Sequence, residues 1–280
     1  EKYNRAIYCM PATVNLDHGM QFVFYIRAWH NFHEYTIANS SGVLVDTTPP
    51  RIGMARAVRF MDSTFSKEVS FTLNLTEVHI DWYRVFSDAE TGIERYMTSL
   101  GTTQGGNEVL GPLDLGSDTR VSFFDLSLTP GVSYYTTVYA YNNLGMLTSM
   151  PSKDLVPDRE DPLTGVVKCN IEFKDNLVIR ANWYGFEDLH SFISNYEWSI
   201  GKSTTKEMTH SFTSSFLETS IHIDALEYGL ENGVSYSIFV RAIDAAGHIS
   251  AAVESNPVIV DYSQPIGCSC QKFVPYVEAI

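Results

Sequence analysis

Acidic side chains cluster in two stretches of this chain and could carry two kinds of chemistry. Asp88 and Glu90 stand two residues apart, and Glu187 and Asp188 occupy a similar stretch further along. Paired carboxylates can act as a general acid and base, or they can bind a hard cation. A turn rich in acidic residues is the simpler interpretation, because Asp readily bonds the backbone of its own turn.

A second acidic pattern is an Asp placed four residues before a Pro, at Asp46, Asp158 and Asp261. Ca²⁺ takes six to eight oxygen ligands, and the supply at these junctions is short. We therefore predict no cofactor and keep Ca²⁺ as the alternative. The carboxylates that would hold it are Asp46, Asp88, Glu90, Asp158, Asp161 and Asp261. Otherwise each junction Asp ends its strand by bonding backbone amides, and the Pro sets the exit direction.

Other groups that could bind metal or do catalysis are scattered. His18, His30 and His33 lie near one another in the sequence, and we interpret them as surface-loop histidines. The sequence contains no Gly-x-Ser-x-Gly, no His-Glu-x-x-His and no phosphate-binding loop. We therefore predict no catalytic residues and a protein that is not an enzyme.

The four cysteines are candidates for disulfides whose connectivity stays open: Cys9, Cys169, Cys268 and Cys270. Cys268 and Cys270 have no second Cys or His cluster nearby, which argues against zinc. Two N-glycosylation acceptor motifs are present, at Asn39 and at Asn74. We therefore expect N-glycans.

The elements that position these residues are repeated. A Leu, a Gly three residues later and an aromatic three residues after that recur at intervals of 112 and 102 residues. The Asp–Pro junctions recur at 112 and 103 residues, and the Gly that opens the next unit recurs at 112 and 102. Separate blocks with nearly one period indicate a tandem array. We predict the C-terminal part of one repeat at 1–50, complete repeats at 51–162 and 163–265, and the start of another repeat or a linker at 266–280.

Within each repeat the hydrophobic residues alternate with period two, which predicts strands with one buried face. Phe22, Phe24, Ile26 and Ala28 form one such face, and Ile80 with Trp82 forms part of another. Turn signals such as 105–107 and 129–131 separate these runs, and no convincing amphipathic helix is present. Short strands with frequent turns, in units of about 100 residues, predict an all-β fold of tandem β-sandwiches.

These residues resemble fibronectin type III domains, which carry a Trp on the second strand and a Leu-x-Pro-Gly-x-x-Tyr turn before the sixth. Trp82 and Trp183 match the Trp, and residues 128–134 match the turn. The resemblance implies Greek-key sandwiches of immunoglobulin-like type. It also implies core roles for Trp82, Trp183, Tyr134 and Tyr236, with each tyrosine hydroxyl bonding back to the backbone. Phe22 replaces this tyrosine in the first copy, and Asn232 replaces the Pro in the third.

Composition limits the partners and the compartment. The net charge of −14 disfavours nucleic acid and anionic lipid surfaces. No apolar run is long enough to span a membrane, so we expect any anchor or targeting segment to lie outside these 280 residues. Acidity, the glycosylation motifs and the tandem sandwich fold together favour an extracellular or cell-surface location.

We predict a non-catalytic structural or adhesive array that acts as a semi-rigid spacer or filament element. The junctions are short and contain Pro, so an extended rod is expected. Its partners would be other proteins or copies of itself, contacted through strand edges and loops. One alternative is a receptor ectodomain that binds a protein or glycan through inter-strand loops. The other is an accessory region of a larger secreted enzyme.

Overall fold

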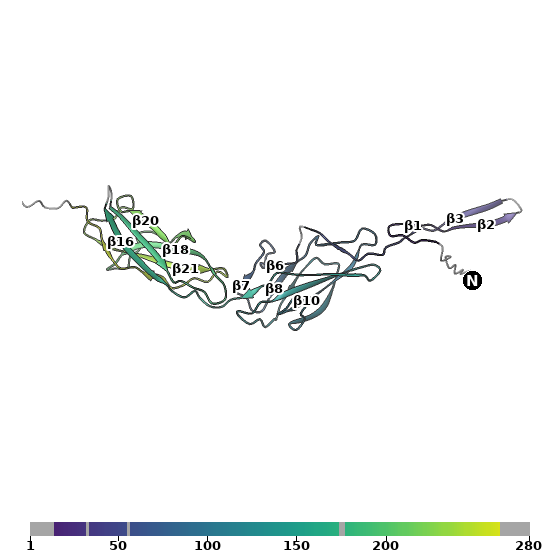
Figure 1. Ribbon diagram of the computed structural model, residues 1–280, viewed down its shortest axis with the longest axis horizontal. Coiled ribbons are helices and arrows are strands. Elements are labelled where there is room, and N and C mark those ends of the chain that lie inside the picture. Colours follow the sequence, from purple (N-terminus) through teal and green to yellow (C-terminus); the bar gives the residue numbers. More distant parts are fainter. Residues whose placement is uncertain (1–13, 32–33, 55–56, 174–176, 264–280) are drawn as a thin grey trace, which may run out of the picture. The chain divides into compact units, whose positions relative to one another are not determined.

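The computed structural model describes residues 14–31, 34–54, 57–173 and 177–263. The chain divides into two compact units, 1–158 and 159–280. All regular structure in the described residues is strand, so the predicted all-β class is confirmed (Figure 1). No helix in this part of the chain could cross a membrane. The segment 266–280 lies outside the described residues, as do Cys9, His33, Cys268 and Cys270.

Residues 51–158 of the first unit form a sandwich of two main antiparallel sheets. One sheet has the order β12-β8-β6, and the other has the order β11-β10-β13-β14. Two short ladders, β5-β9 and the parallel pair β7-β15, complete it. The strands are β5 (Arg51–Ile52), β6 (Arg59–Met61), β7 (Phe71–Thr72), β8 (Val78–Asp81), β9 (Phe86–Ser87), β10 (Ile93–Gly101), β11 (Leu110–Gly116), β12 (Arg120–Phe123), β13 (Tyr135–Asn142), β14 (Leu147–Pro151) and β15 (Val156–Pro157).

The second unit repeats this topology. Its sheets have the orders β16-β17-β20 and β19-β18-β21-β22, and β23 pairs with β21. The strands are β16 (Val166–Phe173), β17 (Leu177–Tyr184), β18 (Ile193–Lys202), β19 (Thr213–Phe216), β20 (Ser220–Asp224), β21 (Ser235–Asp244), β22 (Val253–Glu254) and β23 (Val258–Ile259). In both units the chain passes from one sheet to the other between the second and third main strands, as in Greek-key sandwiches.

Each sandwich core is built around one tryptophan. Trp82 and Trp183 are fully buried. Each ring meets a tyrosine, Tyr96 or Tyr196, at the same centroid separation of 5.9 Å and the same interplanar angle of 65°. Edge-to-face contacts of this kind add to the hydrophobic stabilisation that comes from burial. The packing of tryptophan against tyrosine is therefore the same in the two cores.

The tyrosine corner is present in both units. The Thr129 amide donates to the Tyr134 hydroxyl at 2.8 Å, and the Glu231 amide donates to the Tyr236 hydroxyl at 3.0 Å. Both rings are buried. The bond ties the turn to the strand that follows it.

Residues 14–46 form a third copy of one part of this sandwich. Its ladders are β1 (Gln21–Phe22) with β4 (Val43–Leu44), and β2 (Tyr25–Asn31) with β3 (Glu34–Asn39). A Gly amide bonds a carbonyl of the last strand in all three copies, from Gly19 to Val45, from Gly131 to Pro157 and from Gly233 to Val260. A Ser hydroxyl also accepts the same strand amide in each copy, at Ser40, Ser152 and Ser255. The hairpin therefore has the geometry of β13–β14 and β21–β22.

The first copy differs in burial. Ile26 is 68% exposed, whereas Val138 and Val240, at the same position of the complete units, are 0% exposed. The alternation correctly predicted a strand here, but Phe24, Ile26 and Ala28 are exposed. Among the described residues β2 pairs only with β3, whereas β13 also pairs with β10 and β21 also pairs with β18. In the complete units other strands cover this face, and this accounts for the difference in exposure between Ile26 and its counterparts Val138 and Val240.

Candidate functional site: the Asp46 cluster

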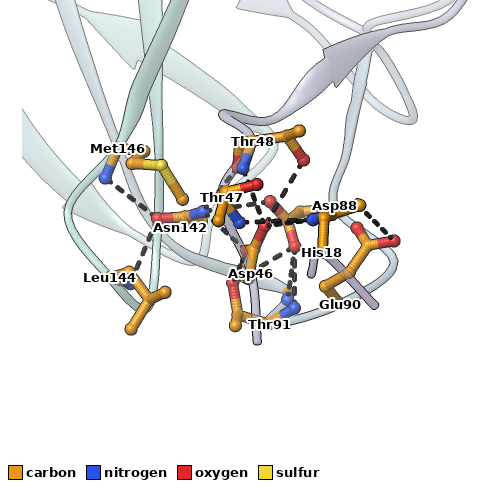
Figure 2. Close-up of polar contacts among 11 residues, drawn as sticks. His18, Asp46, Thr47, Thr48, Asp88, Glu90, Thr91, Asn142, Leu144 and Met146 are labelled. Carbon is orange, nitrogen blue, oxygen red and sulfur yellow. Dashed lines mark hydrogen bonds and ion pairs between the residues drawn. The ribbon is translucent and has the colours of Figure 1, made fainter. Parts of the chain in front are cut away.

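The junction at 47–50 is held by a group of polar side chains, which we call the Asp46 cluster: Asp46, Thr48, Asp88, Thr91 and Asn142 (Figure 2). Asp46 follows β4, Asp88 and Thr91 lie in the loop between β9 and β10, and Asn142 ends β13. The cluster therefore joins the first hairpin to one end of the 51–158 sandwich.

The Asp46 carboxylate uses both oxygens. Its Oδ1 accepts the Thr48 amide at 3.0 Å, and its Oδ2 accepts the Thr91 hydroxyl at 2.7 Å. The Thr48 amide, and after it the Thr91 hydroxyl, hold the pKa of Asp46 below its usual range, against the opposing effects of burial and the Asp88 charge. Asp46 is therefore held as a carboxylate that terminates its strand.

The Asp88 carboxylate folds its own loop in the same way. Its Oδ1 accepts the amides of Thr91 at 2.8 Å and Gly92 at 3.1 Å. Burial is the largest effect on its pKa and raises it, but the Thr91 amide, the Asn142 amide and the Gly92 amide together bring the pKa below its usual range. Two carboxylates thus face one buried site while both stay ionised.

Asn142 separates these two charges. Its Nδ2 lies 3.1 Å from Asp46 Oδ2, 3.1 Å from Asp88 Oδ2 and 3.2 Å from the Thr48 carbonyl, so two N–H groups serve three acceptors. Its Oδ1 accepts the backbone amides of Leu144 and Met146. These bonds fix the orientation of the Asn142 side chain, so its nitrogen faces the two carboxylates. The side chain is fully buried. Asn142 therefore supplies the positive end of a dipole where the two carboxylates converge.

His18 extends the cluster to the surface. The Thr47 amide donates to its Nδ1 at 3.2 Å, so the neutral ring carries its proton on Nε2, which lies 3.3 Å from Glu90 Oε1. His18 Nδ1 also lies 3.6 Å from Asp46 Oδ1. The ring thus connects the start of the hairpin with the loop between β9 and β10.

The arrangement does not fit Ca²⁺ between Asp46 and Asp88. The Nδ2 hydrogens of Asn142 point at the oxygens that a cation would need, and a donor group repels a cation. Turning the amide around would present its oxygen to the cation, but it would remove the acceptor of the Leu144 and Met146 amides. Chemically, these groups hold two segments of chain together.

The other predicted junction residues lie as follows. Asp261 accepts the amide and the hydroxyl of Ser263, as Asp46 does with Thr48, and these bonds lower its pKa. Asp158 is buried, and its amide donates to the Thr72 carbonyl. Asp161 is exposed and Glu90 is half-buried. His30 is exposed as predicted but lies within β2 and not in a loop, and its Nε2 is 2.9 Å from Glu34 Oε2.

The glycosylation and cysteine candidates are placed in different environments. Asn39 is exposed at the end of β3. Asn74 is half-buried, and its Nδ2 donates to Glu77 at 2.6 Å. Cys169 is a buried thiol in β16, and burial raises its pKa to about 11 despite a hydrogen bond with Ser255.

Sequence reasoning missed His18, Thr91 and Asn142 as partners of Asp46. Asn142 lies 96 residues from Asp46. One signal was available, because Asn142 continues the inward-facing alternation of Val138 and Ala140, and a polar residue at the end of such a face needs a partner.

No protein-family model matches the chain, and no curated protein matches it. Among solved structures, the chicken CNTN1 FN1-FN3 domains align with 80% of this chain and 71% of theirs, at 16% identity and a TM-score of 0.43. The fibronectin(III)-like modules of Clostridium thermocellum CbhA align with 73% of this chain and 94% of theirs, at 15% identity and a TM-score of 0.37.

The strand order, the buried tryptophans and the tyrosine corners define the class as tandem β-sandwiches of fibronectin type III-like type. Such sandwiches host many functions, so the function has to be argued from the particular surfaces of this chain.

Proposed function

We propose that the protein is a non-catalytic extracellular array, structural or adhesive, in which short junctions hold successive sandwiches at a restricted angle. The observation that supports this most is the Asp46 cluster. Five side chains and the Thr48 carbonyl tie the residue before the junction to the sandwich after it. The Thr148 hydroxyl adds a bond of 2.6 Å to the Pro50 carbonyl. A freely hinged linker would need none of these contacts.

Electron microscopy of the native full-length protein in negative stain tests this proposal. We expect strings of units with a narrow distribution of bend angles, and a wider distribution in an Asp46→Ala variant. Asp62→Ala is the matched control, because Asp62 also accepts bonds from its own turn, at Ser66 and Lys67. Equal bending in the wild type and in Asp46→Ala would refute the role of the cluster, and compact particles would refute the array.

A strand edge supplies a route to partners. The edge of β2 is occupied in the complete units by β10 or β18, and the exposed Phe24 and Ile26 lie on the face that these sandwiches bury. We infer that an antiparallel strand in the position of β10 pairs with this edge, and that a sheet in the position of β12-β8-β6 covers the exposed face. Hydrogen exchange of the β2 amides in the native assembly should show protection equal to that of β13. Rapid exchange along β2 in the assembly would contradict this inference.

A receptor function is the second candidate, and it is favoured by one exposed loop. Phe216 is 76% exposed and adopts a φ of 54°, a region that L-residues with large side chains rarely occupy. The same bulge in the first unit has Gly116 at a φ of 58°. Leu217, beside Phe216, is also exposed. Strain retained for an exposed aromatic residue points to binding rather than to folding.

Phe216→Gly separates binding from stability. It should stabilise the second unit by about 1 kcal/mol, because Gly adopts this φ without steric cost, while it weakens capture of the native ligand. Leu226→Gly is the control, since Leu226 is equally exposed in another turn. Unchanged ligand capture by Phe216→Gly would exclude a binding role for this loop.

A further inference from the structure

A pocket of about 410 Å³ opens on the outer face of the sheet β12-β8-β6. It is lined by Arg59, Asp81, Tyr83, Thr119 and Arg120. Arg59 and Arg120 flank Asp81 in one row across the sheet, because each pairs with Asp81 in the strand register. The inward-facing neighbours Phe60 and Ile80 belong to the core, so this row faces away from the core.

The positive charge of this row is only partly neutralised. Arg59 Nη2 donates to Asp81 Oδ1 at 2.9 Å, while the Arg59 Nε is buried without a partner in the described part of the chain. The Arg120 guanidinium lies 5.4 Å from the centre of the Phe65 ring, and no carboxylate of the described residues lies within 4 Å of it. Two cations and one anion leave a net positive pocket with unused N–H donors.

An aromatic side chain forms another part of the lining. Tyr83 is 52% exposed, and the Arg84 guanidinium lies 5.1 Å from the centre of its ring. Two arginines thus line this pocket, and a third contacts its Tyr83, in a chain whose net charge is −14. This local reversal of sign attracts anions that the rest of the surface repels.

The second unit lacks this arrangement. At the same register positions it has Lys168, Asn182 and Ser220 in place of Arg59, Asp81 and Arg120. Its Tyr184 is contacted by Lys168, whose Nζ lies 5.5 Å from the ring centre. The fold therefore does not require two arginines in this row, and the second unit provides a matched control.

We propose that the pocket binds an acidic sugar whose carboxylate is received by the Arg120 guanidinium, beside the partly exposed Arg59 side chain. Guanidinium groups match the geometry of planar carboxylates and keep their charge at every physiological pH. The pocket volume lies in the range of small-molecule sites, which combine aromatic walls with a few placed polar groups. The apolar face of a sugar ring packs against Tyr83, and the Thr119 hydroxyl meets a ring hydroxyl. This site goes beyond the array function and does not depend on it.

Titration calorimetry on the full chain tests the proposal, with D-glucuronate and N-acetylneuraminate as probes and D-glucose as the neutral comparison. We expect millimolar binding of one or both acids and none of glucose, with affinity falling as salt rises. Arg120→Gln should weaken binding at least 10-fold and leave the melting temperature unchanged, since Arg120 is exposed and has no carboxylate partner. Lys168→Gln should leave binding unchanged.

Three results would overturn the proposal. The first is that neither acid binds. The second is that Arg120→Gln binds the acid as tightly as the wild type does, or that Arg120→Gln and Lys168→Gln weaken binding equally. The third is that a poly-glutamate peptide binds in an Arg120-dependent way while both sugars fail, which would make this face a docking site for acidic proteins.

Discussion

Replacing Asn142 with Ala removes the centre of the Asp46 cluster. The substitution takes away the donor shared by Asp46 and Asp88 and the acceptor of the Leu144 and Met146 amides. Two backbone amides without an acceptor, in a site where Asn142 was fully buried, cost roughly 2–4 kcal/mol in the free energy of unfolding. The loss should appear in the first unit only.

Hydrogen exchange followed by mass spectrometry can locate this loss in the full chain. We expect faster exchange in peptides covering 140–148 and 44–50, with peptides of 235–250 unchanged. Asn143→Ala is the control, because Asn143 is exposed and makes one bond, to the Thr91 carbonyl at 2.6 Å. It should change stability by less than about 1 kcal/mol.

The effect of pH gives a second readout with a definite sign. The folded pKa values of Asp46 and Asp88 lie below the ordinary 3.8, so their stabilisation is present above that pH and is lost as pH falls through the folded values. Without Asn142 the two acids repel each other more, and protonation relieves this repulsion. The difference between Asn142→Ala and the wild type should therefore shrink below about pH 4. A constant difference, or equal effects of Asn142→Ala and Asn143→Ala, would refute the reasoning.

Three further predictions concern the sandwiches themselves. Trp183→Ala should destabilise the second unit by about 3–5 kcal/mol and leave the melting of the first unit in place by calorimetry, because Trp183 is fully buried in its own core; simultaneous loss of both transitions would contradict it. Tyr134→Phe and Tyr236→Phe should each cost about 0.5–1.5 kcal/mol in urea unfolding, because each removes the acceptor of one backbone amide; no cost in either unit would mean that water replaces the hydroxyl. Cys169 should resist alkylation at pH 8 until the chain is unfolded, because burial raises its pKa to about 11; rapid labelling of the native protein would show that this thiol is accessible.

The sequence by itself determined the strands, the repeat and the class of fold. Alternation of inward and outward side chains is a local consequence of the extended backbone, so Ile80 and Trp82 identified a buried strand face without any knowledge of its partners. The resemblance of residues 128–134 to the fibronectin type III turn implied the tyrosine corner, and a short motif could carry it because the turn and its hydrogen bond lie within five residues of sequence. Asp46 and Asp261 each accept a hydrogen bond from the backbone amide two residues later, so this contact is also local in sequence.

Tertiary structure decided which of these residues meet and which stay exposed. The register of β10 with β13 places Asn142 opposite Ile93, next to the loop that holds Asp88 and Thr91. Thr91 binds Asp46, so Asn142 meets Asp46 across 96 residues of sequence only in the folded chain. The row of Arg59, Asp81 and Arg120 depends on two registers at once, and neither leaves a mark in the local pattern. Ile26 and Val138 follow one alternation but differ in exposure from 68% to 0%. Period two states which residues share a face, and only packing against other strands determines whether that face is covered.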